Sequence, residues 1–252
     1  PWAGACGVFH PMLSEAVVRF QSQTIQEIMP AKGPVKTQIW GLASKEREKQ
    51  AKRVQDYMNF QLCEVMTEYR SETEKLLFSL PLAGSAFRKI YFDPSLGRPT
   101  SMFVPAEDFV VAFNEAGLEQ AERYTHIMNR STNQIKKLQV SGFYRDVELS
   151  SSYIEESPIT DKYREIGGVK PSYEKEDRHQ LLEMHVDVDL PGFEDDDGIA
   201  LPYVITIEKG SSTVLSIYRN WDEEDEFRTK KQHFVHYGYV PGIGFYNLGL
   251  IH

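Results

Sequence analysis

Cysteine and long apolar runs are the scarcest features of this 252-residue chain. Its two cysteines, Cys6 and Cys63, match neither a C-x-x-C redox motif nor the ligand spacing of a zinc site. We therefore expect a reduced, intracellular chain. No apolar stretch approaches the roughly 18 residues that a membrane span requires, and the start of the sequence has no signal-peptide pattern.

Motifs of catalytic and cofactor sites are also missing. There is no G-x-x-x-x-G-K-[ST] loop, which argues against an ATPase, and no G-x-S-x-G nucleophile motif. Neither cysteine lies beside a histidine. The glycines of residues 242–249 lack the spacing of a dinucleotide-binding loop, so we interpret them as sites of tight turns and close packing. We therefore predict a structural protein without catalytic residues and without a cofactor.

A surplus of basic residues is absent as well. The chain has 28 Lys and Arg against 37 Asp and Glu, which gives a net charge of −9. Binding to phosphates requires clustered basic side chains, so this chain is a poor candidate for binding nucleic acid through its phosphates. On charge alone, plain solubility is the favoured explanation, because most acidic proteins do not contact DNA, so the charge does not identify a function by itself.

Helical periodicity is present from the N-terminal side onward. Residues 12–29 place apolar side chains on one stripe, and Pro30 blocks continuation of that helix. Residues 31–41 carry glycines and a proline and are expected to form an extended connection.

The strongest helical signal covers residues 44–80, with Ser44 as a suitable N-cap. Its stripe at helical spacing consists of Val54, Met58, Leu62, Val65, Tyr69, Thr73, Leu76 and Leu80. One helix ended by Pro81 would be roughly 50 Å long. Two helices with a break near Thr67 satisfy the pattern equally well.

Strand patterns follow Gly84. Short aromatic or β-branched runs lie between proline and glycine breaks, at residues 87–93, 101–104, 108–113 and 122–129. Residues 132–140 are predicted to form a short helix that stops at Gly142. Residues 148–180 are interpreted as a loop on the surface, with a short helix around residues 174–182.

Alternation of apolar and polar residues then predicts an antiparallel meander of three strands. These strands are expected at residues 184–190, 199–207 and 213–219. We therefore predict an α+β fold in which long N-terminal helices precede a mainly antiparallel β region. The expected domains are a helical region at residues 1–83 and an α+β region at residues 84–252, with the meander at residues 183–219.

Two acidic runs and a histidine pair are the remaining candidates for chemistry. Residues 194–198 supply carboxylates and a glycine, as a Ca²⁺ or Mg²⁺ loop does, but lack the EF-hand spacing, so a solvated hairpin tip is favoured. Residues 222–226 suit a basic partner surface or a solvated turn. His233 and His236 are expected to face opposite sides of a strand, which argues against a shared metal. His185 is expected to point outward from its strand.

Several segments, in order along the chain, resemble one protein family. They are residues 11–23, 31–36, 57–62, 80–93, 97–111 and 138–147, followed by the aromatic and glycine-rich stretches 213–221 and 232–252. Together they resemble the portal proteins of tailed bacteriophages, in particular the large portals of the short-tailed P22-like group.

The resemblance implies a dodecameric ring at one vertex of a viral capsid, assembled in the host cytoplasm and retained in the virion. Such a ring is the channel for DNA packaging and ejection, and double-stranded DNA passes through it without sequence-specific binding. Its partners would be the major capsid protein, the large subunit of terminase during packaging, and tail adaptor proteins afterwards. The chain would be the N-terminal, wing-like part of the portal. The apolar end at residues 248–251 likewise leads us to expect an incomplete chain.

Charged segments are our candidates for contacts between subunits or with partners. They are Lys45, Arg47, Lys49, Lys52 and Arg53, the aspartates Asp195, Asp196 and Asp197, and the acidic residues Asp222, Glu223 and Glu224. Two alternatives stay open at this point. One is a capsid or tail binding module other than a portal, and the other is a metal-dependent enzyme that uses the acidic loop at residues 194–198.

Overall fold

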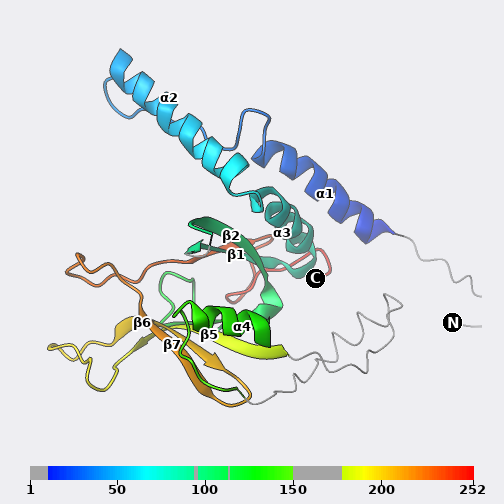
Figure 1. The fold of residues 1–252 in the computed structure, drawn as a ribbon. Coiled ribbons are helices and arrows are strands. Elements are labelled where there is room, and N and C mark those ends of the chain that lie inside the picture. Colours follow the sequence, from blue (N-terminus) through cyan, green and yellow to red (C-terminus); the bar gives the residue numbers. More distant parts are fainter. Residues whose placement is uncertain (1–10, 94–95, 113, 150–177) are drawn as a thin grey trace, which may run out of the picture. The chain divides into compact units, whose positions relative to one another are not determined.

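The structure is a computed structural model that describes residues 11–93, 96–112, 114–149 and 178–252 (Figure 1). Its helices are α1 (Met12–Ile28), α2 (Lys45–Phe60), α3 (Tyr69–Ala83) and α4 (Thr132–Val140), with a π-helical turn at Gln61–Val65 and a 3₁₀ turn at Ala106–Asp108. Its strands are β1 (Ser85–Asp93), β2 (Arg98–Pro105), β3 (Phe109–Val111), β4 (Arg123–Ser131), β5 (Arg178–Val188), β6 (Leu201–Glu208), β7 (Thr213–Arg219) and β8 (Phe234–Gly238). All strand pairs are antiparallel, so the predicted α+β class is confirmed.

The chain forms two compact units, which we describe separately. One consists of Pro1–Ala106 and His233–His252, and the other of Glu107–Gln232. This division does not coincide with the predicted boundary after residue 83. Strands β1 and β2 pack against α3, and β8 from the C-terminal segment pairs with β1. Three strands that follow residue 83 therefore belong to the same unit as the N-terminal helices.

Helix α1 has the predicted extent and packs against α3 in the first unit. Val17 is completely buried, and Phe20 and Ile25 pack against a cluster of leucines on α3. The Phe20 ring also meets Tyr239 edge-on, with 5.4 Å between ring centroids. The helix ends at Ile28, two residues before Pro30, because proline disfavours helical dihedral angles in the residue before it.

The helical segment after Ser44 is divided in two, so of the two alternatives the break near Thr67 is confirmed. The long N-terminal helices of the predicted fold are not found among the described residues. Helices α2 and α3 have 16 and 15 residues, and the longest helix among the described residues is α1, with 17. A π-helical turn at Gln61–Val65 follows α2, and Met66 then leaves helical geometry with φ −87° and ψ 72°. Met66 is 5 % exposed, so the break buries an apolar side chain.

Pro81 lies inside the last turn of α3, and the helix ends at Gly84 rather than at the proline. Pro81 has no N–H to donate to the carbonyl of Leu77, so the helix lacks one hydrogen bond there but continues to Ala83. Gly84 adopts φ 79°, a left-handed conformation that ends the helix, and its N–H donates to Leu80 at 2.9 Å. The Pro81 carbonyl accepts a hydrogen bond from the N–H of Leu250 at 2.7 Å, which ties the C-terminal segment to α3.

The first unit contains a three-stranded sheet in the order β2–β1–β8. Phe87 on β1 is completely buried, and its ring stacks on His236 of β8 at 4.7 Å and on Phe245 at 6.0 Å. The aromatic residues of the C-terminal segment therefore form part of this core. His236 is half-buried there, and its Nε2 lies 3.0 Å from the Ser85 hydroxyl.

Burial lowers the pKa of His236, which predicts a pH dependence of stability. The folded state disfavours the protonated ring, so the unfolded state binds more protons once the pH falls below about 6.5. This contribution to stability is complete above that pH and is lost as the pH falls through the folded-state pKa. In urea unfolding at pH 8 and pH 5, we expect His236→Phe to lose less free energy of unfolding between the two pH values than the wild type does. Equal losses in the two proteins would contradict the assignment.

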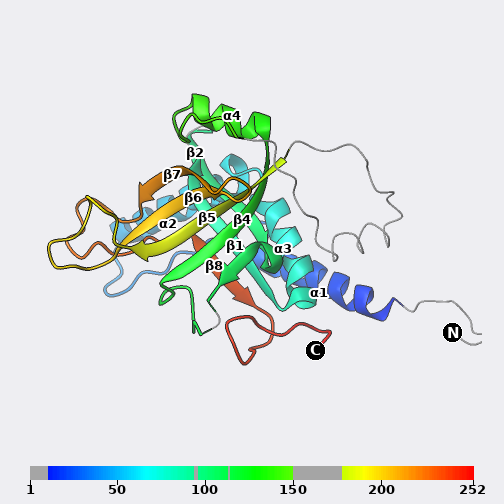
Figure 2. The same cartoon turned by 90° about the horizontal axis from the view of Figure 1, so that it is seen from below.

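The second unit is built on a five-stranded sheet in the order β3–β4–β5–β6–β7 (Figure 2). Strands β5, β6 and β7 form the predicted antiparallel meander. Helix α4 has the predicted bounds, and Ser131 and Gln134 form a capping box at its start. Its cluster on one face of the sheet consists of Met128, Ile135, Tyr144, Leu181 and Leu215. The cluster on the other face is centred on Leu201, Tyr203 and Ile205, and Trp221 packs against it.

Two predictions about β5 are wrong. The helix expected around residues 174–182 is not formed by residues 178–182, which belong to the strand, while residues 174–177 lie outside the described residues. His185 was expected to point outward but is 1 % exposed, and its ring stacks on Tyr124 at 4.9 Å. The reason is that β5 lies in the middle of a sheet whose faces are both covered, so polar positions in its alternation are buried too.

Candidate assembly surfaces

Helix α2 has no buried residue. Ser44 caps it as predicted, because its hydroxyl accepts a hydrogen bond from the N–H of Arg47 at 3.3 Å. The predicted apolar stripe is buried only in α3: Thr73, Leu76 and Leu80 are buried there, whereas Val54 and Met58 on α2 are 51 % and 44 % exposed. Most of the α2 surface therefore has no partner among the described residues.

One side of α2 is held by the extended segment at residues 31–41, which we name the strap. The Asn59 side chain accepts a hydrogen bond from the N–H of Val35 at 2.9 Å and donates to its carbonyl at 3.2 Å. The hydroxyl of Thr37 donates to the carbonyl of Ala51 at 3.1 Å. The strap therefore runs along the face of α2 that carries Ala51, Gln55 and Asn59.

The opposite face of α2 carries four exposed side chains, which we name the α2 stripe: Lys49, Arg53, Tyr57 and Phe60. Steps of four, four and three residues place them on one side of the helix. Tyr57 is 64 % exposed and Phe60 is 53 % exposed. Neither Lys49 nor Arg53 forms an ion pair with another described residue. The stripe thus combines free positive charge with uncovered aromatic surface.

All five basic candidates of the sequence analysis lie on α2 and are exposed: Lys45, Arg47, Lys49, Lys52 and Arg53. With three carboxylates on the same helix, α2 has a net charge of +2, while the whole chain has −9. The guanidinium of Arg47 donates a hydrogen bond to the carbonyl of Leu42 at 3.0 Å, so this side chain already has a partner within the chain. Lys49 and Arg53 remain available to a partner.

The two acidic runs, far apart in sequence, are brought together in the second unit by an ion pair between Asp195 and Arg228. Lys231 pairs with Asp222, and Lys230 pairs with Asp187 on β5 at 2.8 Å. We name the segments 192–199 and 222–228 the acidic loops. Their adjacency depends on Arg228, which follows the second acidic run in sequence and pairs with Asp195 in the first.

Two carboxylates of the acidic loops also accept hydrogen bonds from backbone N–H groups that are close to them in sequence. Asp225 accepts hydrogen bonds from the N–H groups of Thr229 at 2.8 Å and Phe227 at 3.0 Å, which lowers the pKa of its carboxyl. Glu194 accepts from the N–H of Gly192 at 2.9 Å, and this bond lowers the pKa of Glu194. Both residues therefore stay ionised and stabilise the turns in which they lie.

The predicted acidic contact residues divide into two groups. Asp195 and Asp222 are engaged in the ion pairs just described, whereas Asp196, Asp197, Glu223 and Glu224 are exposed. Three large apolar side chains that the sequence analysis did not single out lie among them: Phe193, Ile199 and Phe227 are 63 %, 59 % and 90 % exposed. Their positions in turn segments gave no periodic signal, so only the structure shows them as surface groups.

The metal-loop interpretation of residues 194–198 finds no support in the described part of the chain. No group of three or more His, Cys, Asp or Glu side chains there is arranged to hold a metal ion. Asp195, one of the four carboxylates in this loop, is paired with Arg228 instead. His233 precedes β8 and His236 lies on it, so they do not share a helical face.

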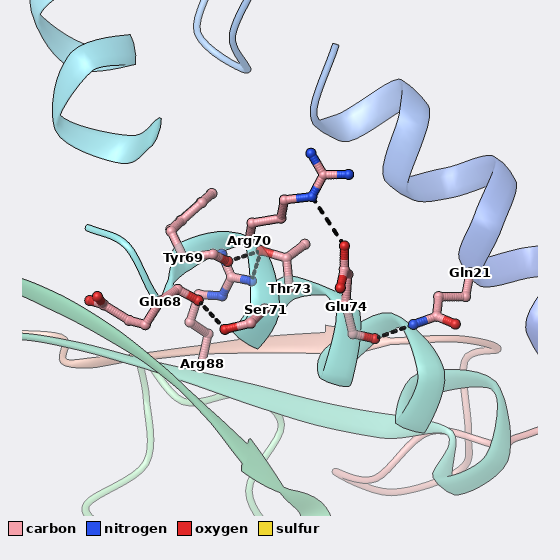
Figure 3. Close-up of polar contacts among 8 residues, drawn as sticks. All are labelled: Gln21, Glu68, Tyr69, Arg70, Ser71, Thr73, Glu74 and Arg88. Atoms are coloured by element: carbon pink, nitrogen blue, oxygen red, sulfur yellow. Dashed lines mark hydrogen bonds and ion pairs between the residues drawn. The ribbon is translucent and has the colours of Figure 1, made fainter. Parts of the chain in front are cut away.

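A polar network beneath α3 was missed by the sequence analysis (Figure 3). Arg88 on β1 is 4 % exposed, and its guanidinium lies 4.6 Å from the Tyr69 ring centroid and donates to the Thr73 hydroxyl at 2.6 Å. Gln21 of α1 donates to the carbonyl of Glu74 at 2.9 Å. These bonds attach α3 to the sheet and to α1, so we interpret the network as structural.

A second ion pair belongs to the same junction. Glu68 binds Arg98 on β2 at 2.8 Å. Burial raises the pKa of Glu68, but the hydrogen bonds from Arg98 and from the N–H of Ser101 outweigh this effect and leave its pKa below the usual value. The carboxylate of Glu72 accepts from the N–H of Phe103 at 2.7 Å. Carboxylates of α3 and of the turn before it thus bind the exposed edge of β2.

No helix in the described segments is both long enough and apolar enough to cross a membrane. Comparison of the chain with models of known protein families gives no match, and comparison with curated protein sequences gives no significant match.

Proposed function

We propose that this chain is the wing-like part of a portal protein that forms a ring at one vertex of a bacteriophage capsid. The resemblance of ordered sequence segments to P22-like portals supports the proposal. The observation that carries it is α2, a helix of 16 residues with no buried side chain and with exposed aromatic residues. The strap contacts only one face of α2, and isolated helices of this length are marginal in water, so we expect contact with another chain to stabilise α2 further.

The surface of the chain offers what a cyclic assembly requires. In a ring, each subunit uses two different surfaces, one for each neighbour. The α2 stripe and the acidic loops differ in charge and lie in different units of the chain. Contiguous exposed apolar surface of the kind seen on α2 is typical of interaction sites rather than of monomeric proteins.

The proposed function is structural and includes no catalytic step. The ring would be the channel for DNA packaging and ejection, and would bind the major capsid protein, terminase during packaging and tail adaptors afterwards. The net charge of −9 supports passage of DNA rather than its retention, because an acidic surface repels phosphates.

A second candidate is a capsid or tail binding module other than a portal. It would use the same exposed surfaces toward a different protein, and the exposed phenylalanines of the acidic loops favour it equally. Oligomeric state separates the two candidates, since a binding module has no need to form a closed ring.

The test is size-exclusion chromatography and electron microscopy of the full-length protein that contains this chain. We expect closed rings with a central channel. A monomer or dimer at high concentration would overturn the portal proposal and favour the binding module.

Substitution of the aromatic residues of the α2 stripe tests the role of α2 directly. We expect Tyr57→Ser combined with Phe60→Ser to reduce the ring fraction strongly, because burial of each ring contributes about 1.5–3 kcal/mol. Val140, which is 80 % exposed on α4, provides the control: Val140→Ser should leave the rings intact. Unchanged ring formation in the double variant, with a normal melting temperature, would show that α2 is not an assembly surface.

A further inference from the structure

The α2 stripe has a specific geometry. Lys49, Arg53 and Tyr57 are spaced by four residues and Phe60 follows three residues later, so one side of the helix carries two cations followed by two aromatic rings. The strap covers the opposite side through Ala51 and Asn59. A partner is therefore free to approach the stripe without displacing the strap.

The acidic loops carry the complementary set of groups. Asp196, Asp197, Glu223 and Glu224 are exposed carboxylates, and Phe193 and Phe227 are exposed rings on the same two segments. The two surfaces are complementary in charge, and both carry aromatic surface that would be removed from water on contact. Charge complementarity with an apolar centre is the usual composition of a specific interface.

The acidic loops are also held in place before any partner binds. The ion pair between Asp195 and Arg228 joins them, and the backbone hydrogen bonds of Glu194 and Asp225 fix their turns. An interface that is already ordered loses less conformational entropy on binding, which increases its affinity.

We propose that the α2 stripe of one copy of this chain docks onto the acidic loops of the next copy in the ring. Lys49 and Arg53 would lie against the carboxylates at positions 196–197 and 223–224, and Tyr57 and Phe60 against Phe193 and Phe227. The contact is heterologous, because each copy uses the stripe toward one neighbour and the loops toward the other. The inference deepens the proposed function and rests on it.

Charge exchange in the full-length protein tests this contact. We expect Lys49→Glu with Arg53→Glu to lower the ring fraction by about tenfold or more, and Asp196→Lys with Glu223→Lys to do the same, because each places like charges opposite each other. The protein that carries all four substitutions restores opposite charges and should recover ring formation. Lys137→Glu with Glu119→Lys, two exposed positions outside both surfaces, should leave the rings intact.

The outcomes separate this inference from the proposed function. If the wild type forms rings and either charge-reversed protein does so equally well, the contact is wrong while the portal proposal stands. If both reversed proteins lose rings but the fourfold variant does not recover them, the two surfaces meet other partners and the inference is again wrong. If the wild type forms no rings, the proposed function fails and the inference fails with it.

A cross-linking measurement gives an independent check that does not depend on charge. Cys6 and Cys63 would first be replaced by serine, since Cys63 is an exposed free cysteine. We then expect Tyr57→Cys combined with Phe227→Cys to form disulfides between subunits under oxidation, seen as a ladder of multimers on a non-reducing gel. Tyr57→Cys with Val140→Cys should give no ladder. Equal ladders from both pairs, or none from the first, would overturn the proposed contact.

Discussion

Gly84→Ala is expected to lower the free energy of unfolding by about 3 kcal/mol or more. Gly84 ends α3 with φ 79°, where an L-residue is strained. A Cβ at this position would also overlap the carbonyl oxygen of Asn247 and the backbone of Leu248 and Gly249. That backbone is not free to move, because the N–H of Leu250 donates to Pro81 and the N–H of Asn247 donates to the hydroxyl of Ser85.

Gly97 is the matched control for this substitution. It has φ 63°, and a Cβ there would meet no atom within 4 Å. Gly97→Ala therefore measures the backbone strain alone, about 1–2 kcal/mol. Urea unfolding of both variants gives the comparison. Equal losses would mean that the close approach of residues 247–249 to Gly84 contributes nothing, and that the C-terminal segment is not anchored there.

Thr73→Val is expected to lower the free energy of unfolding by about 2–4 kcal/mol, although it removes only one hydroxyl. The Thr73 hydroxyl accepts the hydrogen bond of the Arg88 guanidinium, which is buried and forms no ion pair with any described carboxylate (Figure 3). Without that acceptor, a buried charge keeps only its contact with the Tyr69 ring. The large cost thus comes from the desolvated cation and not from packing, because valine has nearly the same volume as threonine.

Arg88→Met distinguishes this explanation from a simple loss of packing. Methionine retains most of the apolar stem and removes the charge, so we expect its stability to stay within about 1 kcal/mol of the wild type. In the double variant Thr73→Val/Arg88→Met, the cost of the threonine substitution should fall by at least about 1 kcal/mol, as measured by a double-mutant cycle in urea. Strictly additive effects would contradict the proposed dependence of Arg88 on Thr73.

Local patterns in the sequence predicted most elements of the fold. Alternation over residues 199–207 predicted β6, and the apolar spacing of residues 132–140 with Gly142 as a stop predicted α4 at its observed bounds. These elements were predictable because each depends on the periodicity of its own residues and on its own turns.

The division between α2 and α3 shows that helical periodicity cannot distinguish one long helix from two shorter ones in line. The spacing from Val65 to Tyr69 and Thr73 continues the stripe across the break, so the pattern is the same for one helix or two. The break is set by burial of Met66 and by the carboxylates of Glu68 and Glu72, which bind β2. Those contacts join residues about thirty positions apart, and no local pattern encodes them.

The candidate surfaces were predictable in part. Charge runs in the sequence indicated both α2 and the acidic loops, but not that Asp195 would pair with Arg228 or that Phe193 and Phe227 would stay uncovered. Conversely, the histidine at position 185 looked exposed in an alternating strand and is buried. Exposure depends on what covers a residue, and coverage is a property of the assembled sheet.

By itself, the sequence determined the class of the fold, the meander, the positions of α1 and α4 and the segments that carry charge, because these follow from local periodicity and turn chemistry. Tertiary structure decided that the C-terminal segment completes the first sheet, that Arg88 depends on Thr73, and that the two acidic runs form one surface. Each of these involves residues distant in sequence. The physical reason is that burial and ion pairing depend on distances in space, which only the packed chain defines.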